Sequence, residues 1–221
     1  NDPVLAILSL RRNGAARIAY VDIDAHHPDG VEVAFADDPD VLMISVHEDG
    51  LWPRTGPLGV TGQGSTVNLP VPRDLNDSEM ALIRDQVILP RVQQFCPDAI
   101  VLQCGADGVL EDPQAHLALS NQAHWSFVRN LKGMAHRFLV LGGGGYNPWS
   151  VGRLWTGVWG ALNDFDVPDR LNPEAEAVLR GLKFDGNSRG GNPPEHWFTT
   201  LADTPRNGEI RSNLRVRVQA L

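Results

Sequence analysis

The sequence predicts an α/β fold of three layers, in which helices cover both faces of a doubly wound, mostly parallel sheet. Segments with strand character alternate with segments of helical periodicity, which favours parallel strands joined by crossover helices. The predicted strands are continuous apolar runs, as expected for strands that are buried on both faces. Several of these runs end in polar or glycine-rich sequence. Open α/β sheets bind ligands beyond the carboxyl ends of their strands, so a site is expected there.

The first predicted element is a helix that begins at Asp2 and Pro3, with Asp2 as its candidate cap, and ends at Gly14. The predicted strands are residues 17–23, 41–47, 66–71, 99–105 and 138–141. The predicted helices are residues 77–95, 122–135, 149–162 and 174–182. Pro90 should kink the first of these helices. Trp155 and Trp159 are expected in the core.

The chain is interpreted as a single domain, residues 1–221, in which residues 183–221 form a surface tail rich in Gly, Asn and Pro. A length of 221 residues suits one large α/β domain. The net charge of −8 argues against direct binding of nucleic acid, which needs clustered Lys and Arg. No apolar run reaches the roughly 18 residues that span a bilayer. With only Cys96 and Cys104 and no signal peptide, we predict a cytoplasmic protein.

The most informative stretch is Asp22-Ile23-Asp24-Ala25-His26-His27-Pro28-Asp29, at the end of a predicted buried strand. Ionised carboxylates in such a place cost several kcal/mol unless they are paired or bind a metal. Asp24 and His26 are two apart and face the same side of an extended chain. The pattern therefore predicts a divalent metal site, and His27 is expected to make structural hydrogen bonds instead.

Two other strand ends add to this site. Asp107 follows the strand at 99–105, and Tyr146 follows a run of four glycines, Gly142 to Gly145, after the strand at 138–141. Two carboxylates and one imidazole leave coordination positions open on Zn²⁺, as in catalytic sites. Tyr146 could present its hydroxyl to a developing oxyanion, although a core tyrosine is equally expected. The glycine run lacks a P-loop ending and favours close approach of backbone to a ligand.

The remaining titratable groups carry weaker signals. Cys104 is expected to pack inside a buried strand. Four histidines have no partner pattern and are expected at surface or helix positions: His116, His124, His136 and His196. His47 at a strand end stays ambiguous.

Three motifs, at residues 21–32, 102–107 and 141–146, resemble the zinc-dependent histone deacetylase family, and the bacterial acetoin-utilisation-type members look most similar. The resemblance covers residues 1–162 well and the remainder loosely. It implies an arginase/deacetylase fold. It also implies zinc, or ferrous iron, on Asp24, His26 and Asp107, with Tyr146 polarising an acetyl carbonyl.

The resemblance further implies structural K⁺ or Na⁺. The first such site would use the side chains of Asp22 and Ser45 with the backbone oxygens of Asp24, His26 and Val46. The second would use Phe35, Asp38 and Val41. Trp52 stands where the family has an aromatic wall of its acyl-lysine channel, and Gly144 where backbone meets substrate. Arg54 stands in place of a glycine beside that channel.

The family's paired histidines have no counterpart here. Asn1-Asp2 resembles the end of a family motif that follows them, so we expect an N-terminally incomplete chain that covers the C-terminal two-thirds of the family domain. Asp22 and Asp29 resemble the carboxylates that orient those histidines. Completing the site would require the missing N-terminal segment.

The predicted function is a metal-dependent amidohydrolase that removes acetyl or other acyl groups from acylated lysine or another amine. One alternative is a non-catalytic metal- or partner-binding fragment. A lesser alternative is an arginase-like dimanganese hydrolase, which is disfavoured because Gly108-Val109 follows Asp107 without a second bridging carboxylate. No membrane or nucleic-acid partner is expected, and a homo-oligomer stays open.

Overall fold

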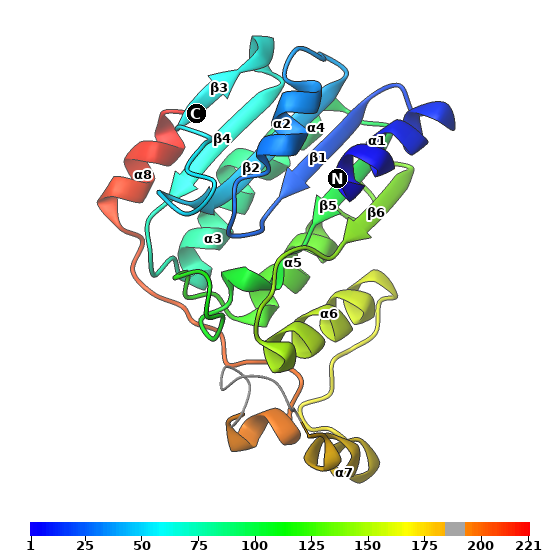
Figure 1. Ribbon diagram of the computed structural model, residues 1–221, viewed down its shortest axis with the longest axis vertical. Coiled ribbons are helices and arrows are strands. Elements are labelled where there is room, and N and C mark those ends of the chain that lie inside the picture. Colours follow the sequence, from blue (N-terminus) through cyan, green and yellow to red (C-terminus); the bar gives the residue numbers. More distant parts are fainter. Residues whose placement is uncertain (184–192) are drawn as a thin grey trace.

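A computed structural model describes residues 1–183 and 193–221 (Figure 1). Its six-stranded sheet has the order β3-β4-β2-β1-β5-β6. The strands are β1 (Ile18–Asp22), β2 (Val41–Glu48), β3 (Gly59–Thr61), β4 (Thr66–Val71), β5 (Ala99–Gln103) and β6 (Arg137–Leu141). All neighbours pair in parallel except β3, which runs antiparallel to β4. The predicted parallel-dominated α/β sheet is confirmed.

Helices cover both faces of this sheet, which confirms the predicted layers. The helices are α1 (Asp2–Arg12), α2 (Asp29–Phe35), α3 (Asp77–Ile83), α4 (Leu89–Phe95), α5 (Asn121–Leu131), α6 (Pro148–Leu162), α7 (Pro173–Gly181) and α8 (Ser212–Gln219). Figure 1 shows α1 and α2 in front of the sheet and α3, α4 and α5 behind it. Successive side chains of a strand point to opposite faces of the sheet. Tyr20 accordingly packs in the core between the sheet and helices α1 and α2, whereas Val21 packs in the core on the opposite face.

Helices α2 and α8 and strand β3 were not predicted, and two predicted helices differ in detail from the structure. Asn1, not Asp2, caps α1, and its side chain accepts a hydrogen bond from the N–H of Val4 at 3.3 Å. The predicted helix 77–95 is divided into α3 and α4 by a π-helical turn at residues 84–88. Pro90 lies in the first turn of α4. Pro90 thus directly follows a π-helical turn, and both features are sites at which helices kink.

The two tryptophans of α6 differ in burial. Trp155 is partly buried and donates its indole N–H to the Cys104 carbonyl at 2.9 Å. Trp159 is 58% exposed, so its predicted core position is wrong. It lies on the outer side of α6, where its ring centroid is 5.3 Å from that of Phe165. Among the described residues, no helix is long and apolar enough to cross a membrane.

The C-terminal segment is more than the surface tail that was predicted, although residues 184–192 of that tail lie outside the described part of the chain. Helix α8 buries Leu214 and Val218 and contacts β4. Upstream, Arg153 and Asp203 form an ion pair of 2.8 Å in which both side chains are only 7% exposed. Tail residues thus contribute to the core through partners far away in the sequence.

Helix α6 offers a matched pair of glycines for a stability test. A Cβ at Gly157 would lie 1.9 to 2.4 Å from the indole of Trp125, whereas a Cβ at Gly152 would meet nothing within 4 Å. Trp125 cannot move easily, since it is 1% exposed and donates to the Leu154 carbonyl at 2.8 Å. We expect Gly157→Ala to destabilise the protein by about 1–3 kcal/mol. We expect Gly152→Ala to stabilise it by about 0.5–1 kcal/mol.

Urea unfolding of both variants measures these changes in free energy. Two shifts of the same sign would contradict the close packing of α5 against α6.

Candidate metal centre

The carboxyl ends of β1, β2, β5 and β6 lie at one edge of the sheet. Asp22 is in register with Ser45 of β2 and with Gln103 of β5, and Gln103 is in register with Leu141 of β6. The segments that leave these strands carry the informative side chains. The topology therefore brings together groups that are more than 100 residues apart in the chain, such as Asp24 and Gly144.

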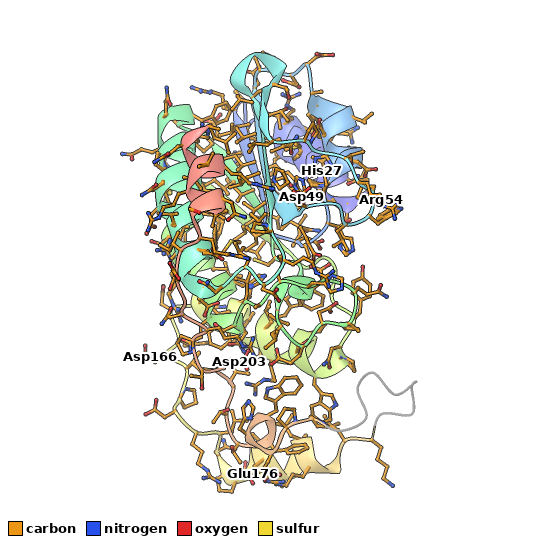
Figure 2. All side chains as sticks on the ribbon, turned by 90° about the vertical axis from the view of Figure 1, so that its left-hand side faces the viewer. His27, Asp49, Arg54, Asp166, Glu176 and Asp203 are labelled. Carbon is orange, nitrogen blue, oxygen red and sulfur yellow. The ribbon has the colours of Figure 1, made fainter. Side chains whose placement is uncertain are left out.

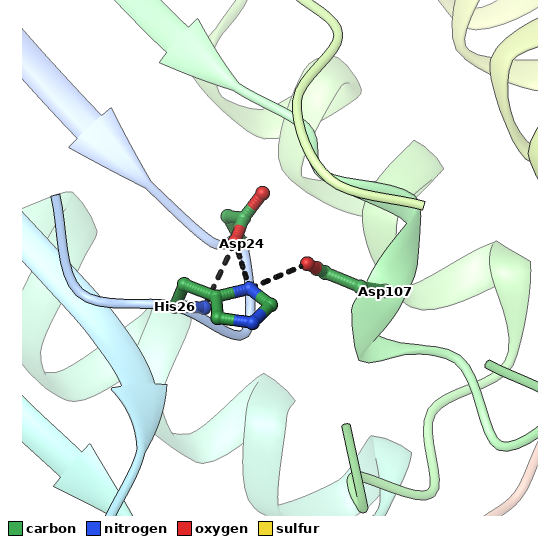
Figure 3. Close-up of side chains that lie close together, drawn as sticks. All are labelled: Asp24, His26 and Asp107. Carbon is green, nitrogen blue, oxygen red and sulfur yellow. Dashed lines mark hydrogen bonds and ion pairs between the residues drawn. The ribbon is translucent and has the colours of Figure 1, made fainter. Parts of the chain in front are cut away.

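Asp24, His26 and Asp107 converge at this edge (Figure 3). One potential ligand atom from each side chain lies within 4.8 Å of the other two. The Nδ1 atom of His26 lies 3.1 Å from Asp24 Oδ1 and 2.8 Å from Asp107 Oδ2. Both carboxylates are buried, whereas His26 is partly exposed. This is the arrangement expected from the strand-end argument, with access from one side.

Backbone N–H groups hold the two carboxylates in place. Asp24 accepts a hydrogen bond from the N–H of Gly144 at 2.7 Å and one from the N–H of His26 at 2.8 Å. Asp107 accepts from the N–H of Ala25 at 2.9 Å. Each loop of the centre is therefore tied to another loop, which makes the geometry preorganised.

The glycine run approaches these carboxylates closely. A Cβ at Gly144 would lie 2.0 Å from Asp107 Oδ2, and one at Gly105 would lie 2.1 Å from Asp24 Oδ2. Gly143 has φ +136°, and a Cβ there would lie 2.9 Å from Asp24 Oδ2. Side chains at these positions would push the carboxylates apart. The run thus brings the backbone close to the two carboxylates, whereas its predicted approach to a ligand stays a prediction.

The electrostatics of the centre favour a bound cation. Hydrogen bonds to Asp107 and Asp24 raise the pKa of His26 to about 10. Burial raises the pKa of Asp107 to about 7. Two buried carboxylates around one imidazole leave negative charge without full compensation. A donor set of two carboxylates and one imidazole fits Zn²⁺ or Fe²⁺, with coordination positions left open.

Two aromatic rings lie beside His26 at the exposed side of the centre. The ring of Tyr146 is 6.2 Å and that of Trp52 is 6.5 Å from the His26 ring, between centroids. Tyr146 is 45% exposed and Trp52 is 72% exposed, so a core role for Tyr146 is wrong. Partial burial, with the charges of Asp107, Asp24 and Asp112, raises the pKa of Tyr146. Its hydroxyl therefore stays protonated and can donate a hydrogen bond at neutral pH.

The two predicted monovalent sites differ in their surroundings. Asp22 and Ser45 are buried next to each other, and Val46 is buried beside them. Asp22 accepts from the Tyr20 hydroxyl and from the N–H of Asp24 at 2.9 Å. Burial and the nearby Asp24 carboxylate raise the pKa of Asp22 well above its usual value. These features fit a cation at the first site.

The second predicted site has a competing partner. Asp38 is held by Arg11 in a bidentate ion pair, with contacts of 2.5 and 2.7 Å. The Phe35 carbonyl accepts from the N–H of Asp38 at 3.0 Å, and the Asp38 carbonyl accepts from the N–H of Val41 at 3.1 Å. Because Arg11 already neutralises the carboxylate, this arrangement does not favour a further cation there.

Beside the centre lies an open hollow of about 300 Å³. Its lining includes Asp22, Asp29, Asn1 and Gln103. Asp29 is exposed and accepts a hydrogen bond only from the N–H of Gly30, at 2.7 Å, among the described residues. The buried Oε1 atom of Gln103 finds no partner within the same set of residues. Two residues of the lining, Asp29 and Gln103, thus keep unused hydrogen-bonding capacity.

Two buried histidines support the loop that carries Trp52. His27 contacts Thr55 Oγ1 through Nδ1 at 2.8 Å and Glu32 Oε2 through Nε2 at 2.9 Å, so its predicted structural role is confirmed. His47 donates from Nε2 to the Gly56 carbonyl at 2.9 Å. Figure 2 shows His27 inside and Arg54 at the surface of the same region. Arg54 has φ +65°, a backbone conformation that glycine adopts without strain.

The predicted surface or helix positions are confirmed for His116, which is exposed, and for His124, which lies in α5, but each has contacts that the sequence did not indicate. His116 bonds through its N–H and Nδ1 to the carboxylate of Glu48, at 2.6 and 2.8 Å. His124 is completely buried in α5, close to Gly108, and burial lowers its pKa to about 4. Both contacts join segments distant in sequence, so spacing alone offered no signal for them.

The fold and the centre define an α/β protein with a candidate metal site at the carboxyl edge of its sheet. A family model described as Histone deacetylase domain matches residues 1–162. The chain therefore belongs to the histone deacetylase family, which confirms the resemblance drawn from the three motifs.

Individual proteins described as histone deacetylases or as an acetoin utilization protein are similar in sequence to this chain. Putative histone deacetylase 2 of Caenorhabditis elegans is 35% identical over 204 residues, which are 90% of this chain and 37% of that protein. Acetoin utilization protein AcuC of Bacillus subtilis is 33% identical over 186 residues, covering 79% of this chain and 48% of AcuC. The chain thus spans less than half the length of these curated relatives.

Solved structures share the fold. The crystal structure of an HDAC homologue from Aquifex aeolicus superposes with a TM-score of 0.87 at 34% identity, covering 99% of this chain and 60% of that chain. A structure of an HDAC homologue complexed with SAHA matches equally well, with a TM-score of 0.87.

Proposed function

We propose that the protein containing this chain is a metal-dependent deacetylase, which hydrolyses the amide bond of acylated lysine or another acylated amine. The observation that carries the proposal is the convergence of Asp24, His26 and Asp107 within 4.8 Å beside the exposed Tyr146. Membership in the histone deacetylase family supports the reaction class.

A zinc or ferrous ion held by Asp24, His26 and Asp107 would polarise the acyl carbonyl and lower the pKa of a bound water. Tyr146 contributes its protonated hydroxyl, which donates a hydrogen bond to the carbonyl oxygen as negative charge develops there. Trp52 adds exposed apolar surface that fits the methylene chain of lysine. Gly144 lets the backbone approach the substrate without a side chain in the way.

The reaction also needs a base to take a proton from water. We infer that a further segment of the protein supplies it, by resemblance a pair of histidines, and occupies the 300 Å³ hollow lined by Asp22 and Asp29. Their carboxylates would orient the histidine rings. Asp22 would in addition bind K⁺ or Na⁺ together with Ser45 and backbone oxygens, because its buried carboxyl group has no cationic side-chain partner among the described residues.

The edge of the sheet supports a further segment independently. In β1, β2 and β4 every residue is buried, whereas β6 has exposed and half-buried residues along its whole length. Figure 1 shows β6 at the outer edge. Strands of a parallel sheet are normally covered on both faces. A strand at the edge of a sheet has unpaired backbone groups on one side, which can pair with a further strand. An additional strand beside β6 would complete the sheet.

Two alternatives remain in view. A dimanganese hydrolase is disfavoured, because Asp24, His26 and Asp107 form the one cluster of three or more potential ligands among the described residues. A non-catalytic metal- or partner-binding fragment is the second alternative. It applies to the 221-residue chain alone, because the hollow beside the centre is open in this chain.

The experiment is an assay of the full-length protein and of the 221-residue chain with an acetyl-lysine peptide, each with added Zn²⁺ or Fe²⁺. We expect metal-dependent release of acetate from the full-length protein and little from the shorter chain. Absence of hydrolysis from metal-loaded, folded full-length protein, on acetylated peptides and on small acetylated amines, would reject the proposed reaction.

A further inference from the structure

A hydrogen bond to a different loop fixes the position of the Tyr146 backbone. Tyr146 follows a glycine run in which Gly143 and Gly145 have φ +136° and +149°, backbone conformations open to glycine but strained for other residues. By itself, a run of glycines allows many backbone conformations. The N–H of Tyr146, however, donates to Oδ2 of Asp112 at 2.7 Å.

Asp112 is suited to fix this position. Its side chain lies in the loop between Asp107 and α5 and is 5% exposed. While Oδ2 accepts from Tyr146, Oδ1 accepts from the N–H of Gln114 at 2.8 Å. One buried carboxylate thus bridges its own loop and the segment that carries the exposed tyrosine. Hydrogen bonds to an ionised acceptor are about twice as strong as neutral ones.

The loop that holds Asp112 is itself anchored at several points. Glu48, at the end of β2, accepts from the N–H of His116 at 2.6 Å. Asn147 donates to the Glu111 carbonyl at 3.2 Å, and Arg206 pairs with the Glu111 carboxylate. These contacts tie the loop to the central sheet and to the C-terminal segment. Because the loop is anchored in this way, the hydrogen bond that Tyr146 donates to Asp112 holds the Tyr146 backbone in a defined position.

We propose that Asp112 is a positioning residue for the deacetylase reaction, which sets the place of the Tyr146 hydroxyl relative to Asp24, His26 and Asp107. The inference rests on the proposed function. Displacing a reacting group by about 1 Å can cost on the order of 10²-fold in rate. An amide at position 112 can accept from only one of the two N–H groups, because its NH₂ would face the other.

The test uses the full-length, metal-loaded protein and the variant Asp112→Asn. We expect kcat to fall about 10-fold or more, while KM and the bound metal stay unchanged. In the background of Tyr146→Phe, the same change should cost less than about twofold, because the hydroxyl that it positions is absent. Asp164→Asn is the matched control, since the Asp164 side chain is 81% exposed, and it should leave kcat unchanged.

A second measurement does not depend on activity. Hydrogen exchange of the Tyr146 amide should be slow in the parent protein and in Asp164→Asn, and fast in Asp112→Asn. If the parent protein lacks deacetylase activity, the proposed function fails, and this exchange still tests the contact. The positioning role is overturned by an equal loss of kcat in both backgrounds, by loss of metal in Asp112→Asn, or by unchanged exchange of the Tyr146 amide.

Discussion

Replacement of Asp107 by alanine is expected to abolish metal binding at the centre. Asp107 is completely buried, and its carboxylate faces His26 Nδ1 at 2.8 Å and the N–H of Ala25 at 2.9 Å. Asp107→Ala removes one of three proposed ligands and the acceptor that holds the loop of the other two. Since partners outside the ligand set already change metal affinity by roughly 10–100-fold, loss of a ligand should weaken binding by more than about 10²-fold.

Elemental analysis after dialysis, with competition against a chelator for affinity, measures this loss. Asp164→Ala serves as the matched control, because Asp164 is an exposed aspartate that pairs with Lys132 and is not part of the cluster. The control should retain one Zn²⁺ or Fe²⁺ per chain. An Asp107→Ala protein that keeps the metal with the affinity of the control would show that Asp107 is not a ligand.

The sheet and its layers were predictable because the information is local. Parallel strands buried on both faces require uninterrupted apolar runs, and helices require their own period, so the central strands and the longer helices can be identified within about ten residues. The short elements α2 and β3 carry too few residues for such a signal. The C-terminal segment was not predictable in this way. Its packing depends on Arg153 with Asp203, and on Arg211 with Glu79, pairs that no local pattern connects.

The candidate site likewise combines residues that a local pattern predicts with contacts between distant segments that no local pattern predicts. Asp24 and His26 lie in one short motif, and the strand-end rule adds Asp107 and Tyr146. What the sequence could not show is the support around them. The contacts of His47 with Gly56 and of Asp112 with Tyr146 join separate loops. Likewise, nothing in the sequence near Asp38 indicates that Arg11 of α1 neutralises it.

Tyr146→Phe is expected to reduce kcat by about 10²–10³-fold, the loss typical for removal of one oxyanion donor, or about 2.7–4 kcal/mol of transition-state stabilisation. The pKa of the Tyr146 hydroxyl is raised by burial and by the carboxylates of Asp107, Asp24 and Asp112, so the hydroxyl is a donor at neutral pH. Its ring stays beside His26 in the variant. KM and bound metal should therefore change little, because phenylalanine keeps the aromatic surface and removes only the hydroxyl.

Steady-state kinetics of the metal-loaded, full-length protein with an acetyl-lysine peptide measure this change. Trp159→Phe is a useful control, since Trp159 is a 58% exposed aromatic residue of α6 that packs against Phe165 at a tilted angle, outside the centre. The two variants separate the chemical role of a hydroxyl from the general effect of changing an aromatic side chain. A Tyr146→Phe protein with kcat within about twofold of the control would exclude the hydroxyl as the oxyanion donor, and a rise in KM alone would assign Tyr146 to substrate binding instead.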